Sequence, residues 1–227
     1  MADEVDTTVA DESGGLRAAD GRVPGRRGRA TRDRLTAATL GMLQDTSYRD
    51  LKVVDIAREA GTSPATFYQY FPDVESAILA LAEEMAEDGN DRLTRIVREG
   101  DWTGKQAYVT TEAIADAYIS FWDDNSGLMR VLDLTSLEGD ERFRSMRTRL
   151  LNEFTIALAG VVATQQQAGK HPADIDPMAV AGVLVSMLAH VASHRGGFET
   201  YDIAAQDLRR AMARIVYTSV TGAKAPK

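Results

Sequence analysis

The sequence predicts an all-α fold of about nine helices, in which a small three-helix N-terminal domain precedes a larger helical domain. Apolar residues recur at spacings of three and four from Leu35 almost to the C-terminus, which is the period of helices with one buried face. The long alternating patterns typical of strands are missing. Gly, Pro and Asn separate the periodic segments, and 44% hydrophobic residues suffice to bury a core.

Residues 1–29 are predicted to be a disordered tail that ends in a basic arm. They are rich in Ala, Asp, Gly and Arg and show little apolar periodicity. Residues 1–20 carry six acids against one arginine, whereas residues 21–70 carry nine bases against five acids. The net charge of −8 at pH 7 therefore conceals a basic block between acidic ones.

The next 44 residues, 30–73, are predicted to form three helices. The first covers residues 31–46, the second 53–60 and the third 64–70. Gly61 ends the second helix, and Pro64 is tolerated in the first turn of the third because its missing N–H has no helical partner there. Phe71 and Pro72 end the third helix.

The remainder, residues 74–227, is predicted to form the larger domain. Asp73 is suited to cap the N-terminus of a fourth helix. Breaks rich in Gly, Pro and Asn then divide this region into helices over residues 74–98, 105–123, 126–137, 141–168, 177–194 and 203–221.

Several classes of protein are disfavoured by composition. The absence of cysteine excludes disulfides and thiolate chemistry. No apolar run approaches the roughly 20 residues that span a bilayer, and the acidic N-terminus does not resemble a signal peptide. We therefore expect a cytoplasmic protein with no membrane partner.

Metal binding, cofactors and catalysis are also disfavoured. His190 and His194 share a helix face, but no third ligand lies at a familiar offset. There is no nucleotide-binding glycine loop and no nucleophile elbow. We expect no metal, no cofactor and no enzymatic activity.

Residues 53–71 have the spacing of a helix-turn-helix, in which the second helix enters the major groove of DNA. Gly61 suits the left-handed turn between the helices, and Ala57 and Ala60 let them cross closely. Hydroxyls, phenols and an amide follow the turn, at Thr62, Ser63, Thr66, Tyr68, Gln69 and Tyr70. Helical proteins often contain a helix-turn-helix that has only a structural role. Such a turn has little need for a row of exposed polar, non-acidic side chains after it.

Residues 32–79 resemble the DNA-binding domain of the TetR (tetracycline-repressor) family of transcriptional regulators. The residues that carry this resemblance are Leu35, Ala38, Tyr48, Ile56, Ala57, Ala60, Gly61, Thr62, Ser63, Thr66, Phe67, Tyr68, Tyr70, Phe71, Pro72, Glu75, Ile78 and Leu79. The resemblance implies a repressor that binds a palindromic operator as a homodimer and is released by a small molecule. The larger domain matches this family in architecture only.

The resemblance also implies DNA-binding roles. Pro64, Ala65, Thr66 and Gln69 correspond to the base-facing set, and Thr62, Ser63, Tyr68 and Tyr70 to the phosphate-contacting set. Arg32 and Lys52 are further candidates for phosphate contacts, whereas the arginines from 22 to 34 either contact DNA or are a solvated arm. Three positions depart from the family pattern, at Ser47, Lys52 and Val74, and the last removes a familiar phosphate-binding lysine.

The last two helices, 177–194 and 203–221, are the candidate dimer interface. The first interleaves small residues with Val183, Val185, Met187 and Leu188, so that two helices from each protomer are able to form a four-helix bundle. The alternative is that these faces pack within their own protomer. The resemblance favours the bundle.

Large apolar side chains of the central helices are candidates for an effector pocket, although such residues are more often ordinary core. They are Tyr118, Phe121, Trp122, Met129, Phe143, Met146, Phe154 and Met187. A hydrophobic or amphipathic effector is expected, with Arg130, Arg147 or Asp116 to orient its polar end. One alternative is a DNA-binding protein without effector control. Another is a helical enzyme or lipid carrier in which the helix-turn-helix has only a structural role.

Overall fold

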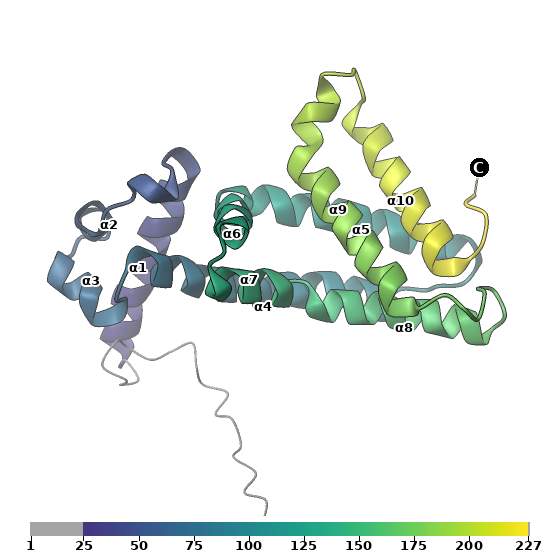
Figure 1. Cartoon of the computed structure of the whole chain (residues 1–227), viewed down its shortest axis with the longest axis horizontal. Coiled ribbons are helices and arrows are strands. Elements are labelled where there is room, and N and C mark those ends of the chain that lie inside the picture. The colour runs from purple at the N-terminus through teal and green to yellow at the C-terminus, as the bar shows by residue number, and fades with distance from the viewer. Residues whose placement is uncertain (1–24, 227) are drawn as a thin grey trace, which may run out of the picture. The chain divides into compact units, whose positions relative to one another are not determined.

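The computed structural model describes residues 25–226, which form ten α-helices and one short 3-10 turn, with no strand among them (Figure 1). The expected all-helical fold is therefore confirmed. The chain divides into two compact units, Met1–Leu81 and Ala82–Lys227. Most of the predicted tail, residues 1–24, lies outside the described residues.

The N-terminal unit contains α1 (Arg26–Asp45), the 3-10 turn η1 (Tyr48–Asp50), α2 (Val53–Glu59) and α3 (Pro64–Tyr70). Helix α2 packs against both α1 and α3. The apolar positions that the sequence pattern assigned to one face meet in this core, where the fully buried side chains include Leu35, Ile56, Ala57, Phe67 and Ile78.

Helix α1 begins five residues earlier than predicted. Residues 26–29, expected in the disordered tail, form its first turn, and the Arg29 amide donates to the Gly25 carbonyl at 2.9 Å. Arginine is a good helix former, so this turn needs no apolar contact of its own. Exposed Arg26, Arg27 and Arg29 are therefore part of α1.

Gly61 makes the turn between α2 and α3 as expected, with φ of +65°. The Thr62 amide donates to the Ala57 carbonyl at 2.8 Å, which satisfies a carbonyl that the end of α2 would leave unpaired. This left-handed residue lets the chain leave α2 and enter α3 almost immediately.

The C-terminal unit begins within α4 (Val74–Glu99) and contains the six helices after it. These helices are α5 (Gly104–Asp124), α6 (Ser126–Glu138), α7 (Glu141–Arg149), α8 (Asn152–Gln167), α9 (Pro177–Glu199) and α10 (Ala205–Thr221). Helix α10 packs along α5, α8 packs along α9, and α6 packs against α7 (Figure 1).

One predicted helix, over residues 141–168, is two helices in the structure. Helix α7 ends at Arg149 and α8 begins at Asn152, with Leu151 at φ −127° and ψ 20°. Leu150 and Leu151 are both buried, whereas neighbouring positions of a continuous helix point about 100° apart. The break lets both side chains enter the core without a proline or glycine to mark it.

Helix α9 is more apolar than the sequence reading allowed. Its segment Pro177–Phe198 is 22 residues long with a mean hydropathy of 1.4, so one helix of the described chain is long and apolar enough to cross a membrane by length and composition. The prediction of no such run was wrong, because Val, Leu, Met and Ala predominate in this segment although Gly, Ser and His interrupt it. Only 28% of its most apolar window is buried.

Candidate functional site

The tip of the N-terminal unit is built around Phe67, whose fully buried ring lies 5.6 Å from the Phe71 ring between centroids. The two residues that follow Phe67 face outward: Tyr68 is 53% exposed, and Gln69 is also exposed. Helix α3 thus turns one apolar residue inward and presents polar neighbours to solvent.

The other candidate contacts around α3 are also accessible. Ser63, Pro64 and Ala65 are exposed, and Thr62, Thr66 and Tyr70 are partly exposed. Ser63 caps the helix, since its hydroxyl accepts from the Thr66 amide at 3.2 Å and lies 2.9 Å from the Thr66 hydroxyl. The cap fixes the start of α3, because it satisfies a backbone N–H group of the first turn.

The remaining two candidates lie away from α3 and the turn that precedes it. Lys52 is exposed at the start of α2. Arg32 is the exception among the ten DNA-binding candidates, because only 6% of it is accessible and its guanidinium lies 5.4 Å from the centre of the Phe71 ring. A weakly hydrated, planar cation is well suited to such stacking, so Arg32 supports the core of the unit.

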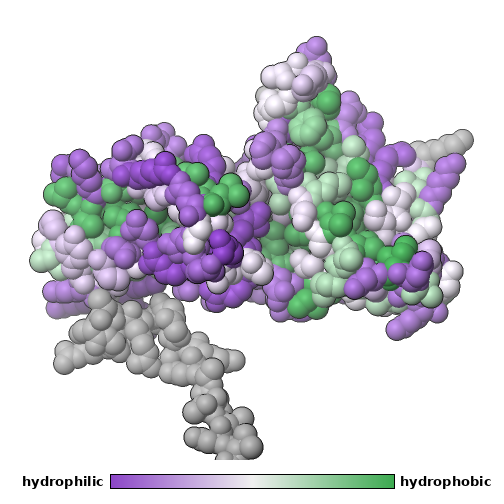
Figure 2. All heavy atoms as spheres, viewed as in Figure 1, coloured by the Kyte–Doolittle hydropathy of each residue, from purple (hydrophilic) through white to green (hydrophobic). Residues whose placement is uncertain are grey.

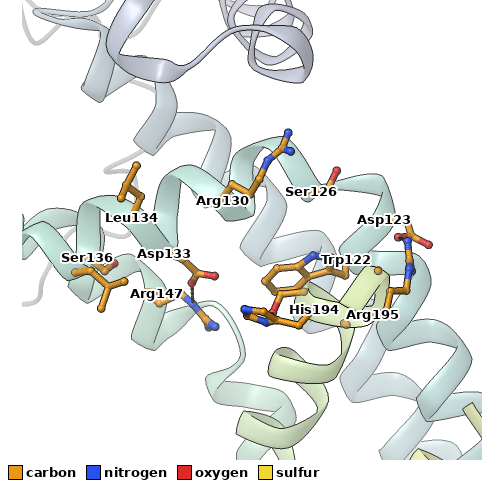
Figure 3. A pocket seen from close by; sticks show the side chains of 14 residues that line it. Trp122, Asp123, Ser126, Arg130, Asp133, Leu134, Ser136, Arg147, His194 and Arg195 are labelled. Atoms are coloured by element: carbon orange, nitrogen blue, oxygen red, sulfur yellow. Dashed lines mark hydrogen bonds and ion pairs between the residues drawn. The ribbon is translucent and has the colours of Figure 1, made fainter. Parts of the chain in front are cut away.

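The C-terminal unit contains a cavity of about 900 Å³ (Figure 3). One face of α6 forms its largest wall, through residues spaced at helical intervals from Ser126 to Leu137. The lining residues are Trp122, Asp123, Ser126, Arg130, Asp133, Leu134, Ser136, Leu137, Arg147, Ala192, Ser193, His194, Arg195 and Gly196. They come from the end of α5, from α6 and α7, and from the end of α9.

The turn between α6 and α7 brings one charged pair into this cavity. Gly139 ends α6 at φ +96°, and Asp140 caps α7 by accepting from the Arg142 amide at 2.9 Å. Hydrogen bonds from Arg142 hold the pKa of Asp140 below its usual range, which keeps the cap ionised. Helix α7 then returns along α6, and Arg147 Nε donates to Asp133 Oδ1 at 2.7 Å.

A second charged pair lies at the far side of the cavity, where Arg195 of α9 pairs with Asp123 of α5. Figure 3 shows the Trp122 ring and His194 between the two pairs. Next to the Arg147–Asp133 pair, Tyr118 is fully buried, and its hydroxyl has no hydrogen-bond partner among the described residues. Burial raises the pKa of Tyr118 far above its usual range, so it remains a neutral donor.

The predicted effector residues are mostly core. Of the eight, only Trp122 lines the cavity; Met187 is partly exposed on α9. The rest are buried, namely Tyr118, Phe121, Met129, Phe143, Met146 and Phe154. Arg130 and Arg147, expected to orient a polar end, both line the cavity, whereas Asp116 pairs with Arg209 elsewhere at 3.4 Å.

The sequence reading missed the polar lining residues, above all Asp133, His194 and Arg195. A mixed polar face on α6, with Ser126, Arg130 and Asp133 at helical spacing, was the available signal. His190 and His194, the discounted metal pair, stack their rings with centroids 4.1 Å apart. The His194 Nδ1 atom lies 3.1 Å from the His190 carbonyl oxygen.

An exposed helix-turn-helix and a second helical unit with a cavity together define a DNA-binding transcription regulator with a ligand-binding domain. Comparison with known proteins gives the family. Residues 35–81 match the family of bacterial regulatory proteins called tetR, and residues 93–227 match the tetracyclin repressor-like C-terminal domain. The chain belongs to the TetR family, whose members are non-enzymatic transcription factors.

Individual relatives are distant. An uncharacterized HTH-type transcriptional regulator from Haemophilus influenzae is 21% identical over 187 residues, which cover 82% of this chain and 85% of that protein. A putative TetR-family regulator from Mesorhizobium loti has a similar structure, with a TM-score of 0.67, 19% identity and coverage of 87% of this chain and 98% of that one.

The regulator FadR from Bacillus subtilis, solved in complex with stearoyl-CoA, has a TM-score of 0.62 and 16% identity. The similarity covers 84% of this chain and 98% of that one. At these identities the similarity to solved structures concerns the fold.

Proposed function

We propose that this protein is a cytoplasmic repressor that binds a palindromic operator as a homodimer and leaves it when a small molecule occupies the C-terminal unit. The observation that carries the DNA-binding part is the tip of α3, where Tyr68 and Gln69 are exposed on a helix that is anchored by buried Phe67. Ser63, Thr66 and Tyr70 surround them, which gives the tip both base-reading and phosphate-binding groups.

The proposed operator contact uses nine of the ten candidate residues. Gln69, Thr66, Ala65 and Pro64 face bases, and Tyr68, Tyr70, Ser63, Thr62 and Lys52 bind phosphates. Arg32 is left out because its side chain is buried against Phe71. The exposed arginines in the first turn of α1 are proposed to supply the positive charge for phosphate binding in its place.

Dimerisation is proposed to occur through α9 and α10. Val183 is 69% exposed and Ile215 of α10 is also exposed, so apolar surface remains on both helices. Figure 2 shows hydrophobic residues along the face where α9 runs. A second copy covers this surface and places the α3 helices of the two protomers about 34–36 Å apart, which is the length of one turn of DNA.

Release is proposed to act through α4, a single helix that begins in the N-terminal unit and ends in the C-terminal one. Gly89 of α4 lies so close to α5 that a Cβ there would be 2.5 Å from the Phe121 ring. Phe121 precedes Trp122, which lines the cavity. A ligand that favours a different position of α5 therefore shifts α4 and lowers operator affinity by its differential binding energy.

The operator-binding proposal is tested with Gln69→Ala and Tyr68→Ala. An operator is first selected from random duplexes with the wild-type protein, and gel shifts then compare the variants on it. Each substitution removes a contact from both half-sites, so we expect at least about a tenfold loss of affinity. Gln44→Ala, which changes an exposed glutamine of α1 in the same unit, is the matched control. Wild-type affinity in both α3 variants would overturn the assignment.

A further inference from the structure

The residues that line the cavity include more cations than anions. Three arginines line it against two aspartates. Asp123 is paired with Arg195, and Asp133 is paired with Arg147. Arg130 has no ion-pair partner within residues 25–226, and it projects at the rim of the cavity (Figure 3). Both acids are thus neutralised and a positive charge remains.

Arg147 is held in a position that leaves part of its guanidinium available. Its bond to Asp133 uses Nε alone, and its terminal nitrogens have no hydrogen-bond partner among the described side chains and backbone. Figure 3 shows these nitrogens pointing away from Asp133 and toward His194. Two parallel N–H donors in a fixed plane match the geometry of a carboxylate or phosphate.

Two buried hydroxyl oxygens of this region have no hydrogen-bond partner within residues 25–226. Ser136 lines the cavity and its Oγ atom is buried without a hydrogen bond. The Tyr118 hydroxyl is buried and interacts electrostatically with both Arg147 and Asp133. Each hydroxyl is able to donate or accept, so these groups add polar character at this end of the cavity. The preference for an anion is carried by the arginines.

The remaining lining favours an apolar body. The Trp122 ring, Leu134, Leu137 and Ala192 supply carbon surface, and about 900 Å³ is far more than an inorganic anion fills. The geometry points to an organic oxyanion as the effector: a carboxylate or phosphate head bound by Arg147, and an apolar group packed against Trp122 and α6. This inference deepens the proposed function and rests on it.

Long-range electrostatics do not account for such a preference. The chain has a net charge of −8, which repels anions, so selective anion binding requires a local arrangement of donors. Asp133 acts here as a positioning residue, because its bond to Nε fixes the plane of the Arg147 guanidinium.

The experiment uses full-length protein carrying Trp102→Phe, which leaves Trp122 as the single fluorescent indole. Four probes share a ten-carbon chain and differ in the head group: decanoate, decyl phosphate, decanol and decyltrimethylammonium, each below its micelle-forming concentration. We expect saturable quenching or a spectral shift, with at least one anion binding at least about tenfold more tightly than decanol and the cation. The two anions distinguish carboxylate from phosphate recognition.

Arg147→Gln should reduce anion affinity at least about tenfold and leave decanol affinity unchanged. Arg144→Gln, on the same helix and away from the cavity lining, is the matched control and should bind all probes as before. Equal binding of decanol and both anions by the Trp102→Phe protein overturns the inference even if the Arg147 variant fails to fold. So does the absence of saturable anion binding.

Operator binding is measured separately, by gel shift without probe. A protein that holds its operator and shows no anion preference contradicts the ligand class alone. A protein that prefers anions and does not bind DNA contradicts the proposed function instead.

Discussion

Single residues determine whether the helix-turn-helix presents its polar tip. Gly61 adopts φ of +65°, a conformation that costs an L-residue with a Cβ about 1–2 kcal/mol. Nothing lies within 4 Å of the position where its Cβ would be, so the cost of a side chain there is one of backbone conformation, not of packing.

Gly61→Ala is therefore expected to lower the free energy of unfolding by about 1 kcal/mol, measured by thermal unfolding of the full chain. Gly61→Asn should cost less, because asparagine tolerates the left-handed region. Gly41→Ala, at a helical position of α1 that also has open space, is the control and should not destabilise. Equal stability of the two alanine variants would show that the turn relaxes.

Arg32 illustrates how burial separates residues that look alike in sequence. It stands among exposed arginines in a basic stretch, which favours a phosphate contact. In the structure its cation lies against the Phe71 ring, at the end of α3. A contact between residues 39 positions apart is fixed by the packing of α1 on the rest of the unit, and no local pattern announces it.

At the scale of elements, the close approach of α4 and α5 is the feature most open to test. A Cβ at Gly89 would lie 2.5 Å from Phe121, whose ring is buried and has little room to move. A methyl group at this position must separate the two helices or displace the ring.

Gly89→Ala is expected to lower the free energy of unfolding by about 1–3 kcal/mol through overpacking, despite the better helix propensity of alanine. Gly160→Ala in α8, where the added carbon meets nothing within 4 Å, should instead stabilise by up to about 1 kcal/mol. Calorimetry of both variants measures the difference. If Gly89→Ala were as stable as Gly160→Ala, α4 and α5 would not be tightly packed there.

Helix boundaries also differ in whether the local sequence predicts them. Where glycine or a capping residue marks an end, as at Gly61 and at Gly139 with Asp140, sequence and structure agree. The break between α7 and α8 has no such mark. It follows from the burial of Leu150 and Leu151 together, which depends on the neighbours of both helices.

At the scale of the whole molecule, α9 exposes an apolar surface that a second copy is proposed to cover. Val183 also borders a groove of about 430 Å³ lined by Ala179, Val180 and Leu184 of the same helix and by Ser219 of α10. Burial of such surface in a dimer gains about 25 cal/mol per Å² of apolar area.

Val183→Glu should convert the proposed dimer into monomers, because dimerisation would place two carboxylates in an apolar interface. Sedimentation velocity at micromolar concentration measures this, with Val54→Glu in α2 as the control for a charge on another exposed valine. The operator affinity of the variant should fall because the dimer is lost, since a dimer that contacts two half-sites binds more tightly than a monomer that contacts one. A dimeric Val183→Glu protein, or a monomeric wild type that floats with lipid vesicles, would contradict the assignment.

The sequence alone determined the all-helical fold, the Gly61 turn and the family, because these depend on helical periodicity and on residues close together in the chain. It also identified Arg130, Arg147 and Trp122 as candidates in the larger unit. Only the tertiary structure decided that Tyr118 and Phe143 are core, that Arg147 meets Asp133, and that the end of α9 lines the cavity. The reason is physical: an apolar helical residue obeys the same pattern whether it faces a core or a ligand, and only the packing of distant helices distinguishes the two.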